Sequence, residues 1–140
     1  MLGIGAAGFM TAITAHDQGA DVLILDKAPE THVVGNSCVG GQDYWWPSDS
    51  NKAVEYQKAM SDGDSIPGDR TKAFQEHLIH VTEWLTKMGA DIQTLTYPGE
   101  YPEFPGGMGR VCRFTKGNGY QRLWLLLMEN ALKKESPGPI

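Results

Sequence analysis

The chain has 140 residues, 41% of them apolar, and a formal net charge of −5. This length and composition suit one ordinary soluble domain. The acidic balance, without any cluster of Lys and Arg, argues against a nucleic-acid partner. The longest apolar run, residues 123–128, is too short to span a membrane, and the N-terminus lacks a signal-peptide pattern. We therefore expect a cytoplasmic protein, with Cys38 and Cys112 as reduced thiols.

A glycine motif near the N-terminus gives the first functional signal. Residues 3–8 read Gly-Ile-Gly-Ala-Ala-Gly, the G-x-G-x-x-G pattern of dinucleotide-binding turns. In that pattern Gly3 allows a tight turn, Gly5 lets a diphosphate approach the backbone, and Gly8 lets the following helix pack closely. The phosphates would then meet free N–H groups at the helix N-terminus, where the helix dipole favours negative charge.

The sequence after the motif predicts a helix and then a strand. Helical spacing runs over residues 7–19, and residues 22–25 form a short apolar run, typical of a strand buried in a parallel sheet. Asp26 ends this run about 20 residues after the glycines, where a carboxylate can bind a ribose hydroxyl. Only two residues precede Gly3, so we expect most of a first strand to be missing from this chain.

The remaining elements are predicted from spacing and turn signals. Residues 34–42 are a glycine-rich segment, and residues 51–60 are a predicted helix. Residues 71–88 are the clearest helix, capped by Asp69 and closed by Gly89. Its apolar stripe consists of Phe74, Leu78, Val81, Leu85 and Met88. A short strand at 92–96, an irregular loop at 97–109 and a helix at 119–134 follow.

Several residue types that often carry chemistry have a simpler interpretation here. Trp45 and Trp46 could form a wall that stacks on a cofactor, but a packed loop anchor is the more common role of such a pair. His77 and His80 have the spacing of two metal ligands but lack a third, so we expect no metal site. Two arginines after the loop are expected in solvent rather than against an anion, namely Arg110 and Arg113.

Three N-terminal segments, residues 3–8, 23–30 and 35–37, resemble the fumarate reductase / 3-ketosteroid dehydrogenase family of FAD-dependent oxidoreductases, known as the FAD-binding 2 family. Residues 84–90, 101–106 and 117–120 are similar to later parts of the family pattern, in the same order. The resemblance covers nearly the whole chain. It implies FAD as cofactor and a Rossmann-like domain.

The resemblance also implies which residues contact FAD. Asp26 would bind the adenosine ribose, with Lys27 near the adenine end, while the 35–41 segment would follow the diphosphate toward the isoalloxazine. The implied set is Gly3, Gly5, Ala6, Ala7, Gly8, Asp26, Lys27, Gly35, Asn36, Ser37, Gly40 and Gly41. The chain departs from the pattern at three places: Asp26 replaces Glu, Val34 precedes Gly35-Asn36-Ser37 where the family has a second Gly, and Gly40-Gly41-Gln42 replaces Ser/Ala-Gly-Gly.

The resulting fold prediction is α/β, a partial Rossmann-like FAD-binding domain with a parallel sheet and helices, whose first strand is largely missing. Residues 1–140 form one incomplete domain: 1–42 are its dinucleotide-binding βαβ part and 43–140 a helical and loop continuation. No complete second domain is expected.

The predicted function is the FAD-binding portion of an oxidoreductase that acts on CH–CH or C=C bonds of a small-molecule substrate and is inactive alone. One alternative is a non-catalytic remnant or nucleotide-binding module; another is a fragment of an NAD(P)-dependent dehydrogenase. No catalytic residue is identified, since the spacing of Tyr120 and the histidines, His32 included, supports no proton relay. The substrate and the electron partner remain open.

Overall fold

The structure, a computed structural model, describes residues 2–29, 35–61, 67–97, 101–115 and 122–134. The chain divides into two compact units. Unit 1 comprises residues 1–42 and 116–140, and unit 2 comprises residues 43–115. None of the described helices is long and apolar enough to cross a membrane.

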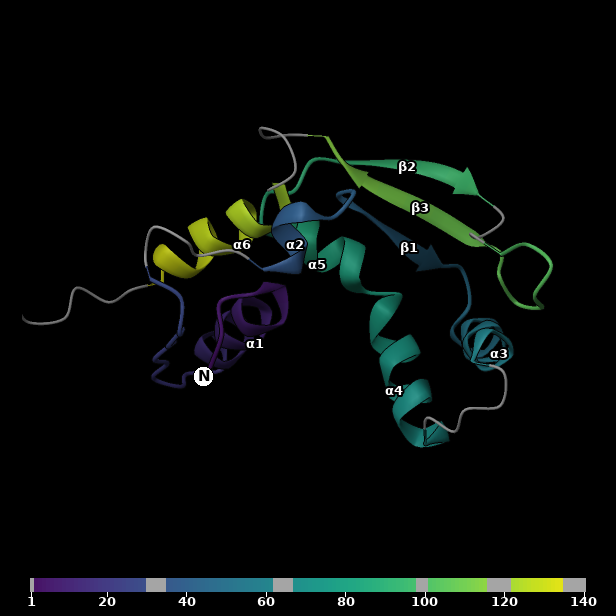
Figure 1. The fold of residues 1–140 in the computed structure, drawn as a ribbon, viewed down its shortest axis with the longest axis horizontal. Coiled ribbons are helices and arrows are strands. Elements are labelled where there is room, and N and C mark those ends of the chain that lie inside the picture. The colour runs from purple at the N-terminus through teal and green to yellow at the C-terminus, as the bar shows by residue number, and fades with distance from the viewer. Residues whose placement is uncertain (1, 30–34, 62–66, 98–100, 116–121, 135–140) are drawn as a thin grey trace, which may run out of the picture. The chain divides into compact units, whose positions relative to one another are not determined.

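The described part of unit 1 contains three helices: α1 (Ala6–Asp17), α2 (Asn36–Val39) and α6 (Arg122–Leu132). Both α1 and α2 pack against α6 (Figure 1). The buried apolar side chains come from all three helices: Phe9, Ala12, Ile13, Cys38, Trp124 and Leu127. Helix α6 is therefore the element that joins the N-terminal segments of this unit.

The predicted helix after the glycine motif is confirmed as α1. Gly19, with φ of 87°, donates its N–H to the carbonyl of His16 at 2.8 Å and ends the helix in the left-handed conformation that favours glycine. Phe9, Ala12 and Ile13 are buried, as their helical spacing predicts.

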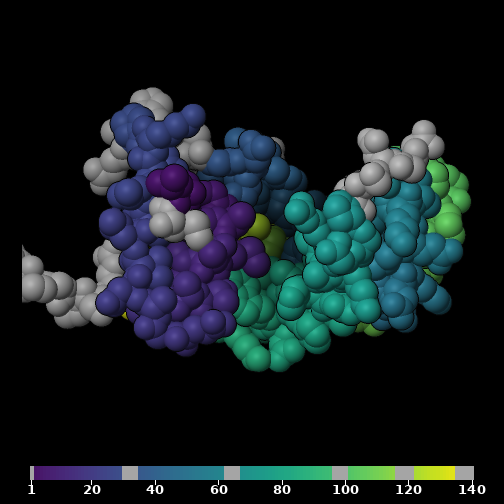
Figure 2. Space-filling view, turned by 90° about the horizontal axis from the view of Figure 1, so that it is seen from below, coloured from purple at the N-terminus to yellow at the C-terminus, as the bar shows by residue number. Residues whose placement is uncertain are grey.

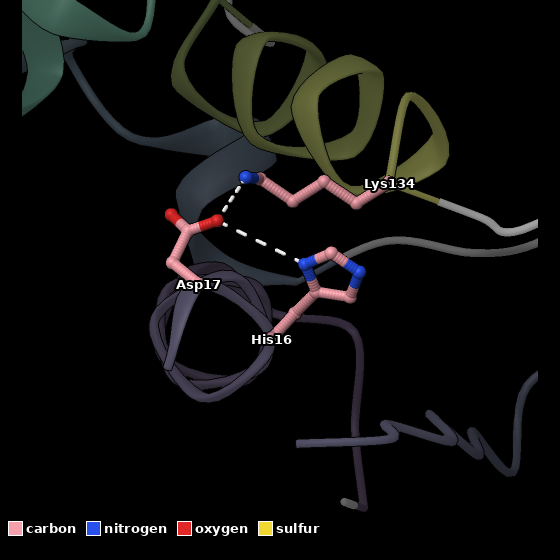
Figure 3. Close-up of polar contacts among 3 residues, drawn as sticks. All are labelled: His16, Asp17 and Lys134. Atoms are coloured by element: carbon pink, nitrogen blue, oxygen red, sulfur yellow. Dashed lines mark hydrogen bonds and ion pairs between the residues drawn. The ribbon is translucent and has the colours of Figure 1, made fainter. Parts of the chain in front are cut away.

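The far ends of α1 and α6 are joined by charged side chains (Figure 3). Lys134, just after α6, contacts the carboxylate of Asp17 at the end of α1. His16 Nδ1 lies 3.8 Å from the same carboxylate oxygen. The hydrogen bond from Lys134 is the largest of the effects that hold the pKa of Asp17 below 3.8.

The predicted strand at residues 22–25 is wrong. Leu25 forms a single parallel bridge with Leu2, where the Gly3 N–H donates to the Leu25 carbonyl at 2.7 Å. Leu23 is 69% exposed, although a buried parallel strand was expected. A central parallel strand needs a ladder on both edges, whereas the contact between Leu2 and Leu25 is an isolated bridge. The N-terminal segments, in purple, lie at the surface in Figure 2.

Unit 2 contains a sheet of three strands: β1 (Asp43–Pro47), β2 (Ile92–Tyr97) and β3 (Gly109–Phe114). Their order is β1-β3-β2, and both pairs are antiparallel (Figure 1). The prediction of a parallel sheet is therefore wrong for the described residues, where the regular sheet is antiparallel. β2 and β3 are consecutive strands, and consecutive strands pair antiparallel without a crossover helix.

Strand β1 was predicted as a loop, and it carries two tryptophans that pack within unit 2. The Trp45 ring lies 5.2 Å from the ring of Tyr56. Trp46 donates its indole N–H to the carbonyl of Ile79 at 2.8 Å. Both tryptophans therefore contact other residues of unit 2, as expected, but they lie on a strand rather than in a loop.

Strand β3 was also not predicted, and its two arginines have partners. Arg113 lies opposite Asp43 in the register and forms an ion pair with it at 3.2 Å. The guanidinium of Arg110 lies 5.3 Å from the centre of the Trp46 ring. Both arginines therefore contact side chains of β1.

The helix predicted at 71–88 is two helices, α4 (Gly68–Leu78) and α5 (Val81–Lys87). The helix is interrupted where the Trp46 indole N–H donates to the carbonyl of Ile79. In a continuous helix, this carbonyl would accept an N–H of the next helical turn. The predicted stripe is wrong for α4, because Phe74 is 57% exposed and the buried residues of that helix are polar, Thr71 and Gln75. The predicted cap Asp69 lies inside the first turn of α4, after Pro67 at the N-cap.

The other predicted elements are confirmed where the structure describes them. Helix α3 (Ser50–Met60) begins after Asp49, whose side chain accepts the N–H of Lys52 at 2.9 Å. Strand β2 and helix α6 lie within the ranges expected from the sequence, apart from single residues at their ends. Tyr120, in the predicted start of the last helix, and His32 lie outside the described residues.

The loop before β3 is irregular over its described residues and packs tightly through glycines. A β-carbon on Gly106 would clash with the backbone carbonyl of Lys52 in α3, and Gly106 has φ of 80°. A β-carbon on Gly107 would lie 2.7 Å from the Tyr56 ring. These glycines are therefore required by contacts within unit 2.

Candidate functional site

The three glycines of the first motif have three different surroundings. Gly3 has φ of 93°, which permits the turn between the Leu2–Leu25 bridge and α1. A β-carbon on Gly8 would clash with the Gly3 carbonyl, so this glycine lets α1 lie against the turn. A β-carbon on Gly5 would have no neighbouring atom within 4 Å. The backbone at Gly5 is therefore open on the side where a side chain would stand.

The second glycine segment lies close to the backbone of the first at Gly5. A β-carbon on Gly35 would lie 3.3 Å from the Cα of Gly5 and 3.9 Å from the hydroxyl oxygen of Ser37. That Ser37 hydroxyl is buried and has no hydrogen-bond partner. Buried polar groups nearly always have a partner, so this hydroxyl marks a place where a ligand would complete the site.

The start of α1 has the electrostatic character of an anion site. Gly5 is its N-cap, no side chain caps it, and its first turn contains no acidic residue. The N–H groups of a first helical turn have no partner within the helix and carry partial positive charge. Ala6 and Ala7 belong to this turn and present only methyl groups beside the backbone. The arrangement suits a phosphate group.

Asp26 braces the glycine turn through its carboxylate. One carboxylate oxygen accepts the N–H of Ala28 at 2.7 Å, and the other accepts the N–H of Ile4 at 2.9 Å. These hydrogen bonds, that of Ala28 first, hold the pKa of Asp26 below 3.8. Each carboxylate oxygen can accept two hydrogen bonds, so the carboxylate retains room for a hydroxyl donor.

The remaining expected site residues lie near these contacts in the chain. Asn36 begins the one-turn helix α2 and is exposed, while Gly40 ends it and Gly41 follows. Lys27 is exposed beside Asp26. The structure thus brings Gly3, Gly5, Gly8, Gly35 and Ser37 together and ties Asp26 to them through Ile4.

Two side chains that support the site were not predicted. Trp124 of α6 donates its indole N–H to the carbonyl of Ile4 at 2.8 Å and packs edge-on against Phe9. Gln42 binds the carbonyl of Ser37 at 2.8 Å. The sequence carries no signal for Trp124, which lies 120 residues from Ile4. For Gln42 the sequence did carry a signal, because it stands at a position where the family pattern has glycine.

The described residues contain no group of three or more His, Cys, Asp or Glu side chains that could hold a metal ion. His77 and His80 are both exposed. Cys38 and Cys112 are buried and free.

The glycine turn, the uncapped start of α1 and the nearby Gly35 have the geometry that a dinucleotide-binding turn requires. A family model for the FAD binding domain matches residues 2–134. The chain therefore belongs to this family of FAD binding domains, and FAD is its cofactor. The open backbone at Gly5 and the unpartnered Ser37 hydroxyl fit such a group.

The chain is similar to three characterised oxidoreductases, which confirms the resemblance seen in the sequence. It is 28% identical to a fumarate reductase (cytochrome) of Shewanella frigidimarina over 96% of this chain and 24% of that protein. It is 27% identical to a 3-oxosteroid 1-dehydrogenase of Mycolicibacterium smegmatis over 76% and 21%, respectively. For an NADH:fumarate oxidoreductase of Klebsiella pneumoniae the identity is 26% over 71% and 12%. The chain thus spans about a quarter or less of these relatives, and no solved structure matches it.

Proposed function

We propose that the chain binds FAD with the diphosphate at Gly5, between the first turn of α1 and Gly35. The observation that supports this most strongly is the open space beside Gly5, together with the close approach of Gly35 to the Gly5 backbone and the unpartnered hydroxyl of Ser37 next to Gly35. The absence of acidic side chains from the first turn of α1 favours the same ligand, because a diphosphate is an anion.

The other residues of the site receive roles by the same proposal. Asp26 accepts a hydrogen bond from the adenosine ribose while its carboxylate continues to hold Ile4 and Ala28. Lys27 lies near the adenine end. Gly3 and Gly8 shape the turn, the amides of Ala6 and Ala7 face the diphosphate, and Asn36, Gly40 and Gly41 continue toward the isoalloxazine.

We further propose that the protein acts as an oxidoreductase on CH–CH or C=C bonds. The fumarate reductases and the 3-oxosteroid dehydrogenase among its relatives support this class. FAD, when bound, supplies hydride transfer at its N5 atom. The described residues of this chain bind and orient the cofactor. We place the substrate site in regions of the relatives that this chain does not match, so the chain alone should bind FAD without turnover.

The test is FAD titration of the purified chain, followed by desalting and measurement of flavin absorbance. We expect the wild-type chain to retain flavin. Gly5→Val should weaken FAD binding at least about tenfold, because the new side chain enters the open space, where its β-carbon meets no protein atom within 4 Å. Its urea unfolding midpoint should stay close to that of the wild type.

The matched control is Gly68→Val at the start of α4 in unit 2. A β-carbon there also has no neighbour within 4 Å, so the same substitution should leave FAD affinity unchanged. If the folded wild-type chain retains no flavin, or if Gly5→Val binds FAD as the wild type does, the proposed site is wrong.

A further inference from the structure

Gln42 has a backbone conformation that is costly for its residue type. Its φ is 61°, and among the non-glycine residues that the structure describes it alone has a positive φ. It also stands where the resembling family pattern ends in glycine. Left-handed backbone favours glycine, so the glutamine side chain must make contacts that offset the conformation.

Those contacts use both the nitrogen and the oxygen of the side-chain amide. Gln42 is buried, with 7% of its surface exposed. Its nitrogen donates to the carbonyls of Ser37 at 2.8 Å and Gly40 at 3.1 Å. Its oxygen accepts the backbone N–H of Leu123 at 2.9 Å. Because carbonyls surround one end and an N–H faces the other, the orientation of the amide is fixed by its partners.

The Leu123 contact connects this glutamine to the rest of the site. Leu123 is the second residue of α6, so its N–H has no partner within the helix. The next residue, Trp124, holds the carbonyl of Ile4 in the first glycine turn. Adjacent residues of α6 therefore hold the two glycine segments, one directly and the other through Gln42.

We propose that Gln42 is a positioning residue that holds Gly35 and the Ser37 hydroxyl opposite Gly5 for the diphosphate of FAD. This role rests on the proposed function above. A glycine at position 42 would allow the same backbone but would remove the side-chain hydrogen bonds that connect the α2 turn to the start of α6. In this chain, the hydrogen bonds of the Gln42 side chain take the place of the backbone freedom that a glycine would provide.

The test compares Gln42→Gly and Gln42→Asn with the wild-type chain. Glycine accepts the backbone and removes all three hydrogen bonds. Asparagine also tolerates positive φ, but its side chain is one methylene shorter and cannot reach both α2 and α6. The control is Gln75→Asn, the same shortening at a buried glutamine of unit 2 that donates to Gln57 at 2.7 Å.

The readouts are the affinities for FAD, ADP and adenosine, and hydrogen exchange at the Leu123 and Leu127 amides. Both Gln42 variants should bind ADP about tenfold more weakly than the wild type. Without the Gln42 contacts, the Ser37 hydroxyl is no longer held in position for its charge-assisted hydrogen bond to the diphosphate. Adenosine should bind equally well, because it lacks the diphosphate. Leu123 should exchange faster while Leu127, inside α6, keeps its protection.

A general loss of stability would instead weaken ADP and adenosine equally and would expose Leu127 as well. That result, or wild-type ADP affinity in Gln42→Asn, overturns the positioning role while the proposed function stands. If the wild-type chain binds neither FAD nor ADP, the proposed function fails and this role fails with it. Exchange at Leu123 then still reports whether Gln42 caps α6.

Discussion

Gly5, in the turn before α1, and Gly106, in the loop before β3, both lack a side chain, but their surroundings differ. A β-carbon on Gly5 would meet no atom within 4 Å, whereas one on Gly106 would clash with the backbone of α3. Gly5 also has φ of −73°, which any residue adopts, while φ at Gly106 is 80°. The space beside Gly5 is open, whereas the space beside Gly106 is occupied by the backbone of α3.

This difference shows that a glycine-rich segment is not in itself a sign of ligand binding. Both segments are rich in glycine, and composition alone does not distinguish their surroundings. The space at each β-carbon distinguishes them, because a ligand can use only a space that the protein leaves free. Substitutions at the two kinds of position should therefore affect different measurements.

The largest effect on stability should come from Gly106→Ala. The new methyl group meets the Lys52 carbonyl, and the left-handed backbone strains alanine. Together these should lower the free energy of unfolding by about 3 kcal/mol. Urea unfolding followed by circular dichroism measures this. FAD affinity of the folded fraction should not change, in contrast to Gly5→Val. A loss below about 0.5 kcal/mol would show that the loop can move away from α3.

An intermediate effect should come from Trp124→Phe, because the glycine turn depends on a directional bond rather than on close packing. Phenylalanine keeps much of the contact with Phe9 but cannot donate to Ile4. We expect a loss of about 1–2 kcal/mol in the free energy of unfolding and weaker FAD binding. Trp84→Phe in α5, a partly buried tryptophan of unit 2, serves as the control. Equal FAD affinity in wild type and Trp124→Phe would show that the bond does not hold the turn.

The smallest effect should come from Asp17→Asn, which breaks the exposed contact with Lys134. Because the pKa of Asp17 is held below 3.8, its stabilising contribution is present above that pH and is lost as pH falls through the lower folded-state pKa. Exposed ion pairs contribute about 0.2–1 kcal/mol. The difference between wild type and variant should thus be small at pH 7 and vanish in acid. It should also shrink in 1 M salt. A difference that persists at pH 2 would assign the effect to packing.

The sequence predicted the parts of the site that depend on local backbone geometry. Gly3, Gly8 and Gly19 could be interpreted from motif and spacing because turns and helix ends are set by neighbouring residues. The one-turn helix α2 could not be predicted in the same way, since four residues show no period. The contacts of Gln42 and Trp124 join residues 81 and 120 positions apart, and local patterns contain no information about them.

The sheet was predicted poorly because strands depend on partners. Residues 22–25 have strand composition, but the bridge of Leu25 to Leu2 is isolated and does not extend into a strand. Residues 43–47 contain a proline and two tryptophans, and became β1 because β3 lies beside them. The helix predicted at 71–88 is interrupted where the indole N–H of Trp46 donates to the carbonyl of Ile79. In each case a contact between distant residues outweighed a local preference.

The position of α6 in the chain also sets the order in which the site can assemble. Its contacts with Ile4 and Gln42 close loops of 120 and 81 residues, so the site has high contact order. At a synthesis rate of about 5–20 residues per second, the glycine turn precedes α6 by roughly 10 s on the ribosome. Throughout that interval the turn lacks Trp124, and Ser37 lacks its connection to Leu123. FAD loading should therefore follow the synthesis of α6 rather than accompany that of the glycine motif.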